Sequence, residues 1–238
     1  MEIFDRKTVE RVAFTIFSSL FFFCLFTPLA ADPVLRGQVA IELETVSFTT
    51  LEEPLQPDLD QVRLRALKEA SFYFGAMIYG WSFDYEIGEK AREIPELFEL
   101  EPLGTIEFGD PRMRATDSAL REMKFTLWCE YRPDQQQTAL LSAWEAGLNR
   151  TTQALGQGLM YTTADPEFWV KGRQAALEDA ARAAVRAILQ GSERNRPKES
   201  RGRIALASFP HYFFDAGRWA VSARFIVEIN DIIPFAAY

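Results

Sequence analysis

The stretch 59–87, LDQVRLRALKEASFYFGAMIYGWSFDYEI, contains in order the patterns of a helix, a helix end and a strand. Apolar side chains recur at steps of three and four residues, which predicts a helix over residues 59–79. An aspartate, Asp58 or Asp60, can cap its start, and Gly80 follows it as glycine commonly follows a helix. The residues after Gly80 then alternate between apolar and polar, as a half-buried strand does.

Four further patterns of alternating or β-rich residues extend this beginning. They predict strands over residues 37–49, 104–108 and 123–131, and a closing hairpin that pairs 204–209 with 218–229. The apolar spacing also predicts helices over about 135–160 and 165–190. We therefore expect an α+β fold, in which an antiparallel sheet of about five to six strands carries about three helices on one face.

Two short segments of similar sequence suggest an internal repeat. Residues 66–70 read ALKEA and residues 176–180 read ALEDA, and in both cases a predicted helix leads to strands. This pattern is one that two related units of a helix followed by strands, over residues 37–133 and 165–230, would produce. The alternative is that both segments are simply typical of helices.

The first residues have the character of an export segment. Basic residues at positions 6, 7 and 11 precede an uncharged, strongly apolar run over 12–26, and TPLAADP at 27–33 ends it. This order predicts that residues 1–31 are either a cleaved signal peptide or a retained N-terminal anchor, because the small-x-small pattern of a cleavage site is incomplete. We expect membrane contact only through residues 12–31, where these are not cleaved, and one α+β domain over 32–238.

Composition excludes several classes of function. The chain carries a net charge of −8, and removal of residues 1–31 takes away as many basic as acidic side chains. A negative surface repels phosphate backbones, so we expect no nucleic-acid partner. Only Cys129 remains after the export segment, which excludes an intramolecular disulfide and a zinc site built from cysteines.

The residues that usually carry chemistry are sparse. His211 is the only histidine, so a catalytic triad has one candidate base. Paired carboxylates, Glu42 with Glu44 and Asp84 with Glu86, project from one face of a predicted strand and are the remaining catalytic option, although such residues commonly face solvent. The sequence contains no phosphate-binding loop, and we expect no metal and no cofactor.

These observations favour a non-catalytic protein of the periplasm or cell envelope, free or anchored in the inner membrane, that binds or scaffolds a protein partner. An alternative is a carrier that holds an apolar small ligand in a cleft between helix and sheet. A carboxylate-dependent hydrolase is the third hypothesis. The ligand-binding candidates of the second are the apolar residues around the first helix end: Phe74, Met77, Trp81, Phe83 and Tyr85.

Overall fold

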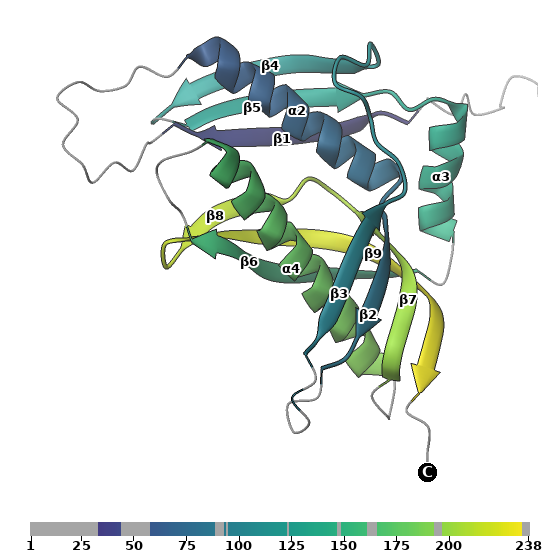
Figure 1. The fold of residues 1–238 in the computed structure, drawn as a ribbon. Helices are drawn as coiled ribbons and strands as arrows, with labels where there is room; N and C mark the ends of the chain where they lie inside the picture. Colours follow the sequence, from purple (N-terminus) through teal and green to yellow (C-terminus); the bar gives the residue numbers. More distant parts are fainter. Residues whose placement is uncertain are drawn as a thin grey trace, which may run out of the picture. The chain divides into compact units, whose positions relative to one another are not determined.

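The computed structural model describes residues 33–43, 58–88, 93, 95–122, 124–146, 149–160, 166–192 and 197–234. The predicted export segment and Glu44 lie outside these residues. Within the described ranges the chain forms three helices and nine strands (Figure 1). In chain order they are β1 (Leu35–Glu42), α2 (Leu59–Ile78), β2 (Trp81–Glu86), β3 (Leu97–Pro102), β4 (Met113–Arg121), β5 (Lys124–Tyr131), α3 (Gln135–Ala146), β6 (Arg150–Met160), α4 (Pro166–Ser192), β7 (Pro197–Leu206), β8 (His211–Asp215) and β9 (Arg218–Pro234).

The predicted α+β class is confirmed, and the strands divide between two antiparallel sheets. One sheet has three strands in the order β1-β5-β4. The other has six, in the order β3-β2-β7-β9-β6, with β8 paired to β9 beside this path. The predicted pairing of 204–209 with 218–229 is present in part, because Ile204–Leu206 pair with Phe225–Val227 of β9. The residues 218–222 pair instead with the intervening strand β8.

Each sheet packs against a long helix of its own. Helix α2 contacts β1 and β5 of the smaller sheet, and α4 contacts β6 and β9 of the larger one. Since α2 also contacts β7, it connects the two layers (Figure 1). No helix in the described ranges is long and apolar enough to cross a membrane.

The predicted boundaries of α2 are confirmed. The Asp58 side chain accepts hydrogen bonds from the backbone N–H groups of Asp60, at 3.0 Å, and Gln61, at 3.4 Å. This capping satisfies donors that the first turn of a helix leaves unpaired. At the other end Gly80 has a φ of +67°, a conformation that glycine adopts without steric cost.

Two predicted elements are wrong. Residues 135–160 are not one helix, because α3 ends at Ala146 and Arg150–Met160 form strand β6. The β-branched pair Thr151 and Thr152 and the glycines that follow favour an extended chain over a helix. Residues 104–108 form no strand, and the strand of this region is β3 at Leu97–Pro102.

The strands that precede the two long helices occupy corresponding places. Strand β1 precedes α2 and pairs with β5, and β6 precedes α4 and pairs with β9. The strands that directly follow the helices, β2 and β7, pair with each other. The predicted repeat over 37–133 and 165–230 stays a prediction, and any related unit would include β6 as the counterpart of β1.

Candidate functional site

The five predicted ligand-binding residues all belong to the hydrophobic core. Phe74 packs its ring against Tyr131 and Phe209, and Phe83 stacks on Phe98. Of the five, Trp81 lines a cavity, whereas the others are absent from the lining of the cavities described below. The buried set is Phe74, Met77, Trp81, Phe83 and Tyr85.

The cavity that Trp81 lines lies between α2 and the segment that leads from β3 to β4. Its volume is about 180 Å³. The sequence interpretation placed a cleft between helix and sheet, but the segment 102–108 forms the opposite wall. The walls are mainly apolar, and they include Ser71, Phe72, Ala76, Trp81, Ile106 and Phe108.

Two glycines allow this segment to lie close against α2. A Cβ atom on Gly75 would lie 3.3 Å from the backbone nitrogen of Ile106, and one on Gly104 would lie 2.6 Å from the ring of Tyr79. A contact of 2.6 Å requires a shift of one of the two groups, so Gly104 cannot be replaced without moving the wall. The cavity thus depends on small residues on both sides.

The mouth of the cavity combines exposed aromatic rings with a cation. Phe72 is 39% exposed and Phe108 is 49% exposed, and the Lys68 Nζ lies 5.8 Å from the centroid of the Phe108 ring. Sequence reasoning missed Lys68 and Phe108. For Lys68, the available signal was a second stripe on α2 that is offset from the core stripe. It consists of positions 68, 71, 72, 75 and 76, which share one helix face.

A buried ion pair joins the two long helices. Arg173 of α4 is 6% exposed and donates to Glu69 of α2 at 2.5 Å and to the carbonyl of Ala40 at 2.9 Å. Its guanidinium lies 4.4 Å from the ring of Tyr212 and 4.8 Å from that of Trp219. Burial is the largest single influence and lowers the pKa of Arg173, but the Glu69 carboxylate together with Tyr73 and Tyr212 outweighs it, and the pKa is raised.

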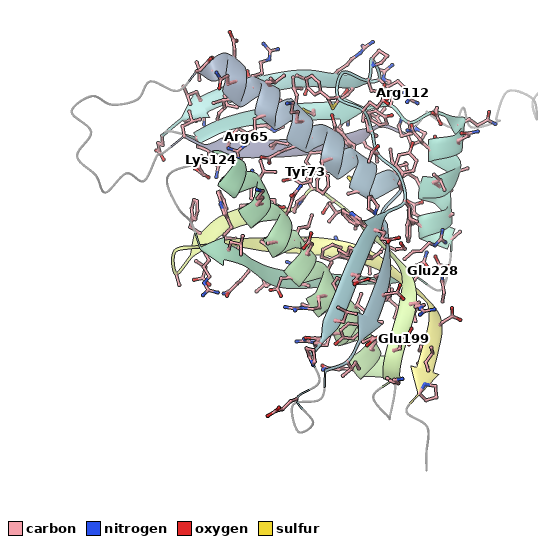
Figure 2. The ribbon with its side chains drawn as sticks, in the orientation of Figure 1. Arg65, Tyr73, Arg112, Lys124, Glu199 and Glu228 are labelled. Carbon is pink, nitrogen blue, oxygen red and sulfur yellow. The ribbon has the colours of Figure 1, made fainter. Side chains whose placement is uncertain are left out.

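The same carboxylate collects further donors from its own helix. Arg65 donates to Glu69 at 3.2 Å, and the Tyr73 hydroxyl donates at 3.1 Å. Figure 2 labels Arg65 and Tyr73 on α2. Burial, followed by the Glu69 carboxylate, raises the pKa of Tyr73 well above its usual range. The Glu69 carboxylate thus accepts hydrogen bonds from Arg65, Tyr73 and Arg173. We assign this cluster a structural role.

A second polar network fixes the start of α3 to the smaller sheet. Asp134 and Gln137 exchange bonds between side chain and backbone N–H, at 2.9 and 3.0 Å, which is a capping box. Arg112, labelled in Figure 2, donates to Asp110 at 2.7 Å and also to Asp134. The Tyr131 hydroxyl donates to Asp110 at 3.1 Å. These bonds, with Arg112 as the main cause, hold the pKa of Asp110 at about 2.

This lowered pKa predicts an acid-sensitive contribution to stability. Because Asp110 is a stronger acid in the folded protein, its contribution is complete above its unfolded pKa near 4 and is lost as the pH falls towards 2. After allowance for solvent screening, Asp110→Asn should cost about 1 kcal/mol at pH 7 and almost nothing at pH 2. Urea unfolding of the variant and the natural protein across this pH range measures whether their free energies of unfolding converge at low pH. Asp231→Asn, on the exposed end of β9, removes an equal charge and is the control.

The two edges of the larger sheet differ in character. The edge strand β3 carries Glu99, Glu101 and Pro102, and charges and proline are residues that discourage pairing with another strand. The opposite edge strand, β6, has no charged residue after Arg150. In the described part of the chain, β6 pairs only with β9.

The outward face of this edge strand is mixed, because exposed leucines alternate with Gln153 and Gln157. The backbone N–H of Gln157 already donates to the Asp179 side chain of α4 at 2.9 Å. Leu155 is 66% exposed and Leu159 is 52% exposed. In the strand register, Leu155 and His211 both lie opposite Ser222, and the exposed Phe213 lies in the next row opposite Ala220. Directly opposed residues share a sheet face, so these side chains belong to one surface. The sequence interpretation missed this surface because it assigned β6 to a helix.

The carboxylate pairs do not gather in a pocket. Asp84 is an exposed residue whose side chain forms an ion pair with Arg201 at 2.7 Å, and Glu86 is exposed at the end of β2. Glu42 pairs with Lys124 of the neighbouring strand at 2.8 Å. None of these residues lines the two cavities described in this article.

The other reactive residues have ordinary surroundings. His211 is exposed, and its ring stacks on Phe213 with the centroids 6.2 Å apart. Cys129 is buried in β5, and burial raises the pKa of its thiol to about 11. No group of three or more histidine, cysteine or acidic side chains suited to a metal ion occurs within the described ranges.

Comparison with known proteins places the chain in a family without a stated activity. A protein of Treponema pallidum (strain Nichols), named "Uncharacterized protein", is 23% identical over 216 residues, which cover 87% of this chain and 87% of that protein. No solved structure matches the chain. One protein-family model, whose description gives no function, matches residues 24–235. Since this match covers most of the chain, the chain belongs to that family.

Proposed function

We propose that this protein is exported to the cell envelope and binds or scaffolds a protein partner there, without catalysing a reaction. The proposal of export rests on the basic and apolar residues of the first 31 positions. The proposal of partner binding rests on the β6 edge, which pairs with no second strand in the described part of the chain and carries exposed leucines.

Strand addition is the mode of binding that this edge supports best. An extended partner segment can form main-chain hydrogen bonds with a free sheet edge, while its alternate side chains contact one face. On β6 that face presents Leu155 and Leu159, with Phe213 on the same surface. The partner strand should therefore carry apolar side chains at alternate positions. The charged β3 edge of the same sheet would not accept such a strand.

Site-specific photo-crosslinking in the host cell tests this proposal. A photoreactive residue at Thr151, exposed on β6, is expected to form an adduct with another protein, whereas the same residue at Glu99 on β3 is not. Leu155→Lys should remove most of the Thr151 adduct, because a charge on this face opposes strand pairing. Equal adducts at both edges, or an adduct that Leu155→Lys leaves unchanged, would contradict the proposal.

Export has an independent test. Fractionation of the host cell, with a mass spectrum of the purified chain, should place the protein in the envelope either without its first residues or with them retained as an anchor. A protein recovered mainly from the cytoplasm with its N-terminus intact would contradict the export proposal and leave the crosslinking result standing.

A further inference from the structure

We propose that the cavity between α2 and the segment 102–108 binds a compact amphiphilic anion. Its apolar group would occupy the cavity, and its carboxylate would pair with Lys68. This site is independent of the β6 edge, and neither proposal depends on the other.

The size of the cavity limits the apolar group. A volume of about 180 Å³ is near the roughly 150 Å³ of an apolar protein cavity that holds benzene. The wall residues Trp81 and Ile106 are nearly buried, and Ala76 leaves space that a larger side chain would fill. The cavity therefore suits an aromatic ring or a short alkyl chain.

The charges around the mouth favour an anion. Among the described residues Lys68 forms no ion pair with an acidic side chain, and its Nζ lies over the ring of Phe108. A second, more open hollow of about 470 Å³ adjoins the same ring and includes Arg63 and Arg114. Three cations thus line the two hollows that share Phe108, in contrast with the net charge of −8 of the whole protein. An anionic ligand is complementary to this local charge.

One acid also lines the second hollow, but it is already engaged. Asp110 accepts hydrogen bonds from Arg112 and Tyr131, so its negative charge is balanced within the fold. Asp110 therefore does not itself neutralise Arg63 and Arg114, which line the same hollow.

The short distance between charge and cavity indicates a compact ligand. Lys68 itself lines the cavity, so the carboxylate must lie only a few bonds from the apolar group. A phospholipid does not meet this condition, because its charged headgroup is separated from the end of its acyl chains. An aryl or short-chain carboxylate does meet it.

Calorimetric titration with three matched compounds tests the proposal. The compounds are 3-phenylpropionate, 3-phenylpropanol and 3-phenylpropylamine, which share the apolar group and differ in charge. The protein is purified from its host, in lipid nanodiscs if the N-terminal segment is retained, with empty nanodiscs as the blank. We expect the carboxylate to bind about tenfold more tightly than the alcohol, since it adds a charge-assisted bond. The amine should bind more weakly than the alcohol.

Two variants separate the contributions of charge and cavity. Lys68→Gln should reduce carboxylate binding to the level of the alcohol and leave alcohol binding unchanged. Ala76→Leu should fill the cavity and abolish binding of all three compounds, with circular dichroism to verify the fold. Lys198→Gln, an equal loss of charge at an exposed position of β7, should change none of these affinities.

Several results would overturn the proposal. These are the absence of binding of all three compounds to the natural protein, equal binding of carboxylate and alcohol, and carboxylate binding that Lys68→Gln leaves intact. If a lysophospholipid displaces 3-phenylpropionate when it is present at the lower concentration of the two, the site prefers a lipid and the proposal of a compact ligand is wrong. Because Lys68→Gln leaves the cavity in place, its result remains decisive even if Ala76→Leu fails to fold.

Discussion

Replacement of Glu69 by methionine is expected to lower the free energy of unfolding by about 3–5 kcal/mol. The substitution leaves the guanidinium of Arg173 buried at 6% exposure without its carboxylate, with the carbonyl of Ala40 as its remaining hydrogen-bond acceptor. Methionine is a good helix former, so the loss does not come from the propensity of α2. Chemical denaturation of the variant and the natural protein measures the difference.

Two further variants identify burial of the charge as the cause. The double variant Glu69→Met with Arg173→Met should be more stable than Glu69→Met alone, because apolar residues then occupy both sites of a buried pair. Arg182→Met removes an exposed partner of Asp179 from the same helix as Arg173, and should cost less than about 1 kcal/mol. A double variant less stable than Glu69→Met would show that packing, and not the unpaired charge, dominates.

The pair also explains how the two layers depend on each other. Glu69 lies on the helix of the smaller sheet and Arg173 on the helix of the larger sheet, and the rings of Tyr212 and Trp219 enclose the guanidinium from β8 and β9. Loss of this contact removes a polar connection between segments far apart in the chain. We therefore expect a single cooperative unfolding transition in the natural protein, since the layers share buried contacts.

Local patterns were sufficient to predict the elements with strong periodicity. The helix α2 and its glycine end were predicted from local sequence, with either Asp58 or Asp60 as the cap, as was the alternation of Trp81, Phe83 and Tyr85 in β2. These signals are strong because one face of each element is buried and the other is not. The buried position of Cys129 follows the same alternation in β5.

Elements with little burial left no such signal. Strand β4 is exposed along nearly all of its length, so its sequence MRATDSALR lacks an apolar alternation. Strand β8 is short and mostly exposed. Edge strands of this kind are stabilised by their neighbour's hydrogen bonds, which a pattern of side chains cannot reveal.

The division into two sheets and the cavity beside α2 depend on contacts between distant segments. Strand β2 leaves the layer of its preceding helix and pairs with β7, a pairing that no local sequence feature specifies. The cavity requires the segment 102–108 to cross α2 at Gly75, and the sequence pattern had assigned part of that segment to a strand. The five apolar residues predicted as a ligand site lie in the hydrophobic core. Their spacing in the sequence fits a packed core as well as it fits a ligand site.

The second large effect is expected at Gly156 of β6. Gly156→Ala should lower the free energy of unfolding by about 3 kcal/mol, at the upper end of the usual cost of overpacking. The added Cβ would lie 2.1 Å from the carbonyl oxygen of Ala176 and 2.3 Å from the backbone nitrogen of Ala180. Both atoms belong to the backbone of α4, so no side-chain rotation relieves the contact. The strand or the helix must move.

A glycine outside this contact provides the control. Gly217 has a φ of +74° and no atom within 4 Å of an added Cβ, and Gly217→Asn should cost less than about 1 kcal/mol, because asparagine tolerates this conformation. A loss below about 1 kcal/mol for Gly156→Ala would show that α4 and β6 separate easily. Close packing through Gly156 and Gly158 holds the inner face of β6 against α4, while Leu155 and Leu159 face away from it. The variant should therefore also weaken partner capture at Thr151, since a displaced edge no longer presents a straight row of main-chain donors and acceptors.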